Sequence, residues 1–307
     1  MKDSFWEYYH PTKKELIRMK KNAIFVFDAC ALLRLYGYKN KKRNSILKMM
    51  DDLSKKDRVW IPYQFCSEFY KNRKDRIDQE FKRKEIVIGK LDSLEKDLYS
   101  SYFNDQEHFT LKIDSIVKDL QNTITRQKNK INKNKCNPDW REPENDIILK
   151  RLEKILKDKI GNDYDDDKKS AIESEINKRA RIKKQPGVSD IGKSNGDTIA
   201  WFQILDYSEN LSKPIILVTE ETKDDFWEEK KRNDKIFPRR SLVKEFHDKS
   251  GKLFSILNLE EFIKYITEKN YVPLFDNEKE IVENEVVVGS SVVGVDSSLL
   301  NNEQVTN

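Results

Sequence analysis

The hydrophobic positions of this chain form a few short unbroken runs that are separated by amphipathic stretches. The runs occupy residues 24–27 and 59–62 and, far downstream, residues 214–219 and 253–256. An apolar run without polar alternation is typical of a strand that is buried on both faces of a parallel sheet. Because helical patterns separate the runs, the sequence predicts an α/β fold with a mostly parallel sheet flanked by helices.

Amphipathic helices are predicted where apolar residues recur three or four positions apart. The predicted helices outside the central region are residues 12–20, 32–36, 45–53, 197–205, 259–266 and a stretch that starts after Pro62. Charged residues dominate the central region, residues 82–184, where glycine is scarce and apolar residues recur at helical spacing. We therefore expect a long, coiled-coil-like helical insertion within the sheet domain.

Four segments follow from these patterns. They are a first part of the sheet domain at residues 1–84, the helical insertion at 85–184, a second part at 185–276 and a tail at 277–307. The tail is rich in valine and carries six acidic residues against one basic residue. We expect this tail to be disordered or to form a strand that docks on something else.

The overall composition is very polar, with 59 Lys and Arg, 54 Asp and Glu and a mean hydropathy of -0.83. No apolar run approaches the roughly 18 residues of a membrane span, and the N-terminal residues lack the apolar stretch of a signal peptide. We therefore expect a cytoplasmic protein with no membrane partner. The positive charge outside the acidic tail suits a polyanionic partner such as nucleic acid, although solvated lysine-rich helices would have the same composition.

The cysteines and histidines do not form a catalytic or metal-binding pattern. Cys30, Cys66 and Cys136 have unrelated spacings that fit neither a disulfide framework nor a zinc site, so we expect structural thiols. The three histidines have no partner at metal-ligand spacing. A catalytic site in this chain would consequently be built from carboxylates.

Acidic residues do occur at the junctions between predicted elements. Asp28 ends the first strand, Glu68 lies in the first turns of the helix after the second run, and Asp197 starts the helix after the insertion. The run at 214–219 is followed by four acidic residues, Glu220, Glu221, Asp224 and Asp225. In a parallel sheet these junctions converge on one edge, where open α/β sheets bind ligands.

Carboxylates that cluster in this way repel one another unless a cation joins them, and oxygen-only ligands suit Mg²⁺ or Mn²⁺. Such ions activate water and stabilise the charge of a phosphoryl displacement. Two of the acidic residues also have an ordinary explanation. Asp197 is placed like a helix cap and Glu68 like a surface residue of its helix.

Four motifs together resemble those of PIN-like nuclease domains, in particular the bacterial branch with a long helical insertion before the third acidic motif. They are FVFDACALL at 25–33, WIPYQFCSEFYKNR at 60–73, GDTIAW at 196–201 and VTEETKDDFW at 218–227. The resemblance extends over residues 5–266 and implies a PIN-like fold. It also implies a nuclease that depends on Mg²⁺ or Mn²⁺, most often an RNase, without a covalent enzyme intermediate.

The resemblance assigns roles by motif position. Asp28, Glu68 and Asp197 match the three core acidic ligands. Glu221 matches the fourth, where the family commonly has Asp or Asn, and Asp225 matches a further acid before an aromatic residue. Which of the four acids after residue 219 completes the site stays open.

Substrate contacts are expected from polar residues near these motifs. Asn72 and Arg73 match the branch's pattern, and Asn72 lies four residues after Glu68, on the same helix face. The other candidates are Arg76 beside them and Lys183 and Lys184 before the third motif. Structural packing is the alternative role for Asn72 and Arg73.

The sequence thus predicts a metal-dependent endoribonuclease that acts on RNA or single-stranded nucleic acid. The resemblance to PIN-like nucleases also implies a role as a toxin or in phage defence. Three alternatives stay open: a catalytically weak nucleic-acid-binding or scaffold protein of PIN-like fold, a single-stranded DNA nuclease, and a phosphatase-like hydrolase. The helical insertion and the tail are the surfaces where we expect a protein partner.

Overall fold

The structure is a computed structural model, and it describes residues 5–9, 11–103, 113–133, 138–186, 195–222, 225–228, 237–268 and 271. The chain divides into one compact unit, Met1–Asp276, and a separate segment, Asn277–Asn307. The predicted tail at residues 277–307 lies outside the described residues, as does Cys136. All of the described residues belong to the compact unit.

Its centre is a parallel sheet of three strands in the order β1-β2-β3. The strands are β1 (Ile24–Phe27), β2 (Ile215–Val218) and β3 (Phe254–Leu257), and every residue in them is buried. The register places Phe27 beside Val218, and Val218 beside Leu257. These strands coincide, to within one residue at the end of β3, with three of the four predicted apolar runs, and the predicted parallel sheet flanked by helices is confirmed.

The fourth run, residues 59–62, was expected to be a further strand and is much less regular. Val59 makes a single parallel bridge to Phe25, and Ile61 makes another to Ile160. Pro62 has no backbone N–H to continue a ladder, and a helix begins at the next residue. This segment therefore only lines the edge of β1.

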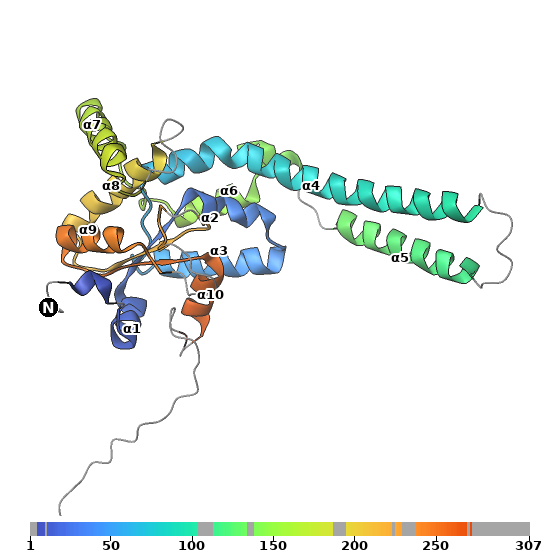
Figure 1. The fold of residues 1–307 in the computed structure, drawn as a ribbon, viewed down its shortest axis with the longest axis horizontal. Helices are drawn as coiled ribbons and strands as arrows, with labels where there is room; N and C mark the ends of the chain where they lie inside the picture. Colours follow the sequence, from blue (N-terminus) through green and yellow to red (C-terminus); the bar gives the residue numbers. More distant parts are fainter. Residues whose placement is uncertain are drawn as a thin grey trace, which may run out of the picture. The chain divides into compact units, whose positions relative to one another are not determined.

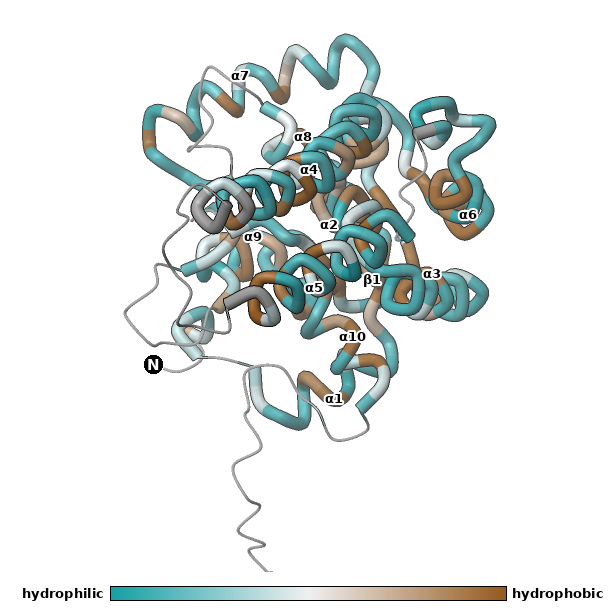
Figure 2. Tube along the Cα trace, turned by 90° about the vertical axis from the view of Figure 1, so that its right-hand side faces the viewer, coloured by the Kyte–Doolittle hydropathy of each residue, from teal (hydrophilic) through white to brown (hydrophobic). Residues whose placement is uncertain are grey.

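Helices surround the sheet (Figure 1). The elements that precede the third predicted motif are η1 (Trp6–Tyr8), α1 (Lys13–Asn22), α2 (Ala29–Arg34), η2 (Leu35–Gly37), α3 (Asn40–Ser54), α4 (Tyr63–Phe103), α5 (Ile113–Lys133), η3 (Pro138–Arg141), η4 (Pro143–Asn145), α6 (Ile147–Ile155) and α7 (Asp166–Ile182). The later ones are α8 (Gly196–Glu209), α9 (Arg240–Ser250) and α10 (Leu259–Thr267). Figure 2 shows that hydrophilic residues predominate along these helices and are interspersed with hydrophobic ones. None of the described helices is long and apolar enough to cross a membrane.

The predicted helical insertion is built on α4, a single helix of 41 residues. Its second half packs against α5, and Lys128 of α5 pairs with both Asp92 and Glu95 of α4 (Figure 1). The helix crosses residues 84 and 85 without a break, so the sheet domain and the insertion share one continuous helix rather than meeting at a linker.

A buried ion pair fixes α4 to the segment that returns from the insertion. Arg73 Nη1 lies 2.6 Å from Asp146 Oδ2, and both side chains are almost fully buried. The same guanidinium donates to the carbonyl oxygens of Trp140 and Arg141 at 2.6 and 2.9 Å. Asp146 also accepts from the Tyr36 hydroxyl and from two backbone amides in the first turn of α6. Every charge in this cluster is therefore compensated.

Candidate active site

Asp28 lies at the carboxyl end of β1 and caps the N-terminus of α2. It is only 6% exposed, because the strand before it and the helix after it are both packed into the core. Its Oδ2 accepts hydrogen bonds from the Thr219 hydroxyl at 2.6 Å and from the Cys30 thiol at 3.0 Å. The backbone amide of Cys30 donates to Oδ1 at 3.4 Å. The carboxylate is thus held in one orientation at the edge of the sheet.

The electrostatic setting of Asp28 disfavours its charged form. Burial raises the pKa of its carboxyl above the ordinary value, and hydrogen bonds from Cys30 and Thr219 offset part of this shift. The negative charge of Glu221 raises the pKa of Asp28 further. Two carboxylates that repel each other at a buried edge are favourable neighbours for a cation, which would stabilise both in their ionised form.

Thr219, the residue after β2, connects these two acids. Its hydroxyl donates to Asp28 and accepts from the backbone amide of Glu221 at 3.0 Å. Cys30 has a similar bridging position, since its sulfur accepts from the amide of Glu220 at 3.2 Å. Burial and the charge of Asp28 raise the pKa of the Cys30 thiol well above its usual value, so it stays protonated and can donate to Asp28.

The acids after β2 differ in their surroundings. Glu220 accepts from the backbone amide of Leu259 at 2.9 Å and so caps α10, with Arg34 at 3.9 Å. Glu221 lies beside Asp28, and its carbonyl oxygen accepts from the indole of Trp227 at 2.7 Å. Asp225 is completely buried, and Asp224 lies outside the described residues. This arrangement favours Glu221 over Glu220 as the partner of Asp28.

Glu68 lies where α4 packs against the start of α8, the helix that carries Asp197. Gln64 donates its side-chain amide to Glu68 Oε1 at 2.8 Å, and its backbone amide donates to Gln203 of α8 at 3.0 Å. Gly196, the first residue of α8, is so close that a β-carbon on it would lie 1.8 Å from Glu68 Oε1. Asp197 is the next residue, in the first turn of α8, and is half-buried. The absence of a β-carbon at residue 196 therefore leaves room for the Glu68 carboxylate.

The structure thus places Asp28 beside Glu221, and Glu68 beside Gly196, the residue before Asp197. Helix α4, which carries Glu68, contacts both α2, which Asp28 caps, and α8, which carries Asp197. Within the described part of the chain, no group of three or more His, Cys, Asp or Glu side chains lies close enough to hold one metal ion. The metal site formed by all four acids stays a prediction.

A pocket of ≈ 380 Å³ opens at the Asp28–Glu221 end of the sheet. It is lined by five carboxylates and two cationic side chains, which are Glu220, Glu221, Glu228, Glu260, Glu261, Arg34 and Lys42. The volume is in the range of small-ligand pockets. Carboxylates and cationic side chains together suit a ligand that carries phosphate and a metal.

The predicted substrate contacts are placed very differently from one another. Arg73 is buried in its ion pair with Asp146, so the structure supports packing as its role and leaves no free guanidinium for phosphate. Arg76 pairs with Glu80 at 2.7 Å, and Lys184 pairs with Glu245 at 2.8 Å. Asn72 and Lys183 remain candidates, and their role as substrate contacts stays a prediction.

Gly196→Ala is expected to lower the activity of this site at least about tenfold without lowering stability. An alanine is a better helix former than glycine by up to ~1 kcal/mol, but its methyl group would displace the Glu68 carboxylate. Gly89→Ala is the matched control, because nothing lies within 4 Å of a β-carbon at that position of α4. Urea unfolding and any activity of the wild type would be compared, and equal activity of both variants would contradict a role for the Glu68 position.

The fold and the site define an α/β domain with carboxylates and a pocket at the carboxyl end of its parallel sheet. A family model described as a PIN-like domain matches residues 24–242, which is more than half of the chain. The chain therefore belongs to the PIN-like domain family, and the resemblance drawn from the four motifs is confirmed. No curated protein and no solved structure matches the chain. PIN domains are generally nucleases and typically use divalent metals, so the family supports a nuclease.

Proposed function

We propose that this chain is a metal-dependent endoribonuclease that hydrolyses phosphodiester bonds in RNA. The observation that carries the proposal is the carboxylate of Asp28, buried at the carboxyl end of β1 and held by Thr219 and Cys30 beside Glu221. Membership of a family of nucleases supports the reaction class. The pocket beside Glu221 supplies room for a phosphodiester.

The residues present fit a divalent cation. All donors are oxygen atoms, and the raised pKa of Asp28 together with its repulsion by Glu221 is the kind of strain that a cation relieves. Asp28, Glu68, Asp197 and Glu221 are the residues that would hold Mg²⁺ or Mn²⁺, whereas the fully buried Asp225 fits this role less well. When bound, such an ion supplies an activated water and stabilises negative charge during phosphoryl transfer.

The other side chains of the site position its groups. Thr219 and Cys30 donate to Asp28 Oδ2 and so fix the direction of its carboxylate. Arg34 and Lys42 line the pocket with Glu220 and Glu221, where they would attract the phosphate of a substrate. Gln64 orients Glu68 in the same way from within α4.

Cleavage of matched single strands tests this function. Purified protein would be incubated with end-labelled RNA and DNA of the same sequence in Mg²⁺, in Mn²⁺ and in EDTA. We expect internal cuts in RNA with either metal and none in EDTA, because removal of the cation leaves the water unactivated. Preferred cleavage of DNA would favour the single-stranded DNA nuclease. Release of phosphate from small esters without cutting of polymers would favour the phosphatase-like hydrolase.

A toxin or phage-defence role would follow from such an activity in the cytoplasm. Binding of RNA without cleavage under any metal would instead favour the catalytically weak binding or scaffold protein. A protein partner that docks on the helical insertion or the tail fits either function.

A further inference from the structure

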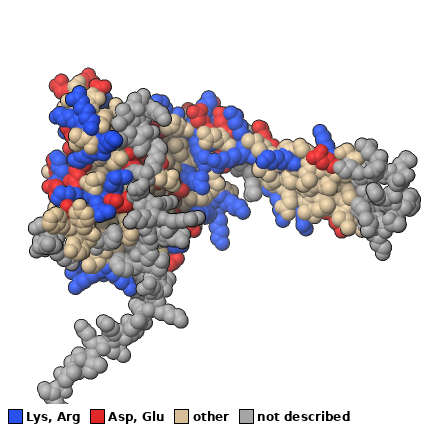
Figure 3. Space-filling model, viewed as in Figure 1, with Lys and Arg blue, Asp and Glu red and all other residues tan. Residues whose placement is uncertain are grey.

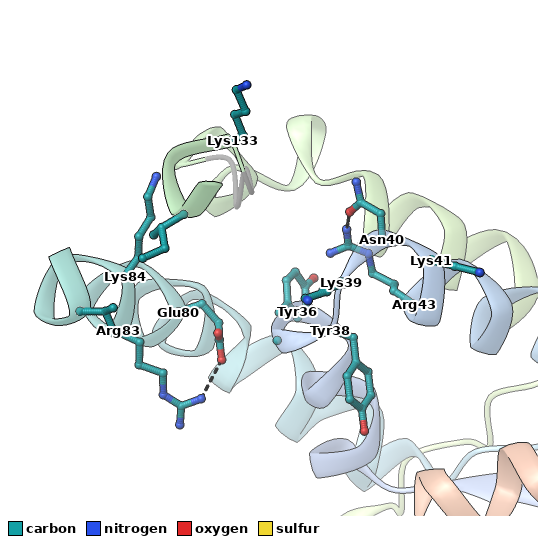
Figure 4. Close-up of a pocket in the computed structure, with 13 residues that line it drawn as sticks. Tyr36, Tyr38, Lys39, Asn40, Lys41, Arg43, Glu80, Arg83, Lys84 and Lys133 are labelled. Carbon is teal, nitrogen blue, oxygen red and sulfur yellow. Dashed lines mark hydrogen bonds and ion pairs between the residues drawn. The ribbon is translucent and has the colours of Figure 1, made fainter. Parts of the chain in front are cut away.

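A second and larger pocket, of ≈ 750 Å³, lies between the start of α3 and the pair formed by α4 and α5 (Figure 4). It is lined by one carboxylate, Glu80, and by six cationic side chains. These are Lys39, Lys41, Arg43, Arg83, Lys84 and Lys133. The cations come from two parts of the chain, the start of α3 and the helical insertion.

At least three of these six cations have no ion-pair partner in the described part of the protein. Glu80 is already shared by Arg83 at 3.0 Å and Arg76 at 2.7 Å. Lys39, Lys84 and Lys133 make no ion pair with the described residues. Figure 4 shows Lys39 and Glu80 on opposite sides of the open space, with Lys84 and Lys133 extending in the same direction at its rim. The pocket is therefore suited to an anion.

Helix α3 adds to this field. It has 15 residues, its first turn lines the pocket, and its N-cap residue Lys39 makes no side-chain capping hydrogen bond. The N-terminal end of a helix carries a partial positive charge and offers backbone N–H groups to anions. Figure 3 shows Lys and Arg side chains over the part of α4 that lies before its contact with α5.

This second pocket, which we call the basic pocket, shares one lining residue with the pocket of the candidate active site. Tyr38 lines both pockets, and Lys42 lies 4.3 Å and Arg34 5.8 Å from the centre of its ring. A polyanion that extends from the pocket beside Glu221 past Tyr38 would thus contact cationic side chains between Tyr38 and Lys39. An aromatic ring flanked by cations is the kind of surface on which single-stranded bases stack.

We propose that the basic pocket holds the sugar-phosphate backbone of a single-stranded nucleic acid whose scissile phosphate lies at Asp28 and Glu221. This inference rests on the proposed nuclease function and assigns the helical insertion to the substrate interface. The volume is in the range for small ligands, so it accommodates a few flexible nucleotides, whereas a stiff duplex is too wide to enter. Lysine contacts to phosphate give affinity without sequence selectivity.

The test is equilibrium binding of a labelled 12-nucleotide single strand to the full chain in EDTA, measured by fluorescence anisotropy at several salt concentrations. The test variant combines Lys39→Gln, Lys84→Gln and Lys133→Gln. The matched control combines Lys14→Gln, Lys21→Gln and Lys154→Gln, three exposed lysines that line neither pocket. We expect the test variant to bind at least about tenfold more weakly, with a slope of log K against log salt that is shallower by about 2. The control should match the wild type within about twofold.

Each outcome has a distinct meaning. Equal affinity and equal salt slope in the test variant would overturn the pocket as a backbone site, provided that its thermal unfolding matches the wild type. Equally tight binding of a duplex, with the same loss in the test variant, would overturn the single-strand assignment. A free nucleotide that displaces the strand at micromolar concentration would mark a small-molecule site instead. Because no step of the assay needs cleavage, failure of the wild type to cut RNA would remove the proposed function and leave this binding result intact.

Discussion

Asp28→Asn is expected to abolish metal-dependent cleavage and to leave nucleic-acid binding unchanged. Asparagine keeps the size of the side chain and can still accept a hydrogen bond from Thr219, but it carries no charge to hold a cation. Loss of several kcal/mol of transition-state stabilisation corresponds to a rate at least about 100-fold lower. Single-turnover cleavage of labelled RNA, with anisotropy as the binding measurement, separates the two effects.

The same variant should be at least as stable as the wild type when metal is absent. The folded-state pKa of Asp28 is raised, so the folded protein keeps a proton that the unfolded chain has already lost. The pKa of Asp28 in the unfolded chain is about 3.9. As the pH rises from this value through the higher pKa of the folded protein, the wild type loses stability relative to Asp28→Asn. Above the folded-state pKa, the difference in free energy of unfolding between the two proteins is constant. Urea unfolding from pH 4 to pH 8 measures this difference. Undiminished cleavage by a folded Asp28→Asn protein would remove Asp28 from the catalytic site.

Asp146→Ala is expected to lower the free energy of unfolding by about 3–5 kcal/mol. The substitution leaves the Arg73 guanidinium buried without a counter-charge, and it removes the cap of α6 as well. The measurement is urea or thermal unfolding followed by circular dichroism. A loss below about 1 kcal/mol would show that Arg73 finds another partner or reaches solvent, which would reopen its assignment as a substrate contact.

Asp51→Ala provides the matched control for this stability effect. Asp51 pairs with Lys55 on the surface of α3, and the Lys55 side chain is 69% exposed. Exposed ion pairs contribute little, so a change within about 0.5 kcal/mol is expected. A similar loss in both variants would mean that the unfolding measurement does not report on burial of the Arg73 charge.

Local patterns were sufficient to locate the sheet and the first acid. The unbroken run before Asp28 could only be accommodated as a buried strand, and a strand there places Asp28 at the edge of the sheet. Residues 59–62 show the limit of the same argument, because an apolar run is not a strand unless a neighbour is free to pair with it. Here only isolated bridges formed before Pro62 and α4.

Contacts between distant residues could not be predicted in this way. Arg73 was expected near substrate because of its motif, but its partner Asp146 lies 73 residues away and only the return of the insertion brings them together. Thr219 likewise binds Asp28 because the pairing of β1 with β2 places the two strand ends side by side. The nearness of Gly196 to Glu68 depends on how α4 and α8 pack, which no spacing in the sequence encodes.

The continuity of α4 sets a rule for how the insertion can vary in length. Glu68 and the residues that pair with α5, Asp92 and Glu95, are carried by one uninterrupted rod with 3.6 residues per turn. One residue added between them would rotate the outer part of the rod by ~100° relative to Glu68, whereas seven residues, close to two full turns, would extend it with little rotation. The rotation of the outer part of α4 relative to Glu68 therefore constrains the insertion more strongly than the length of the insertion does.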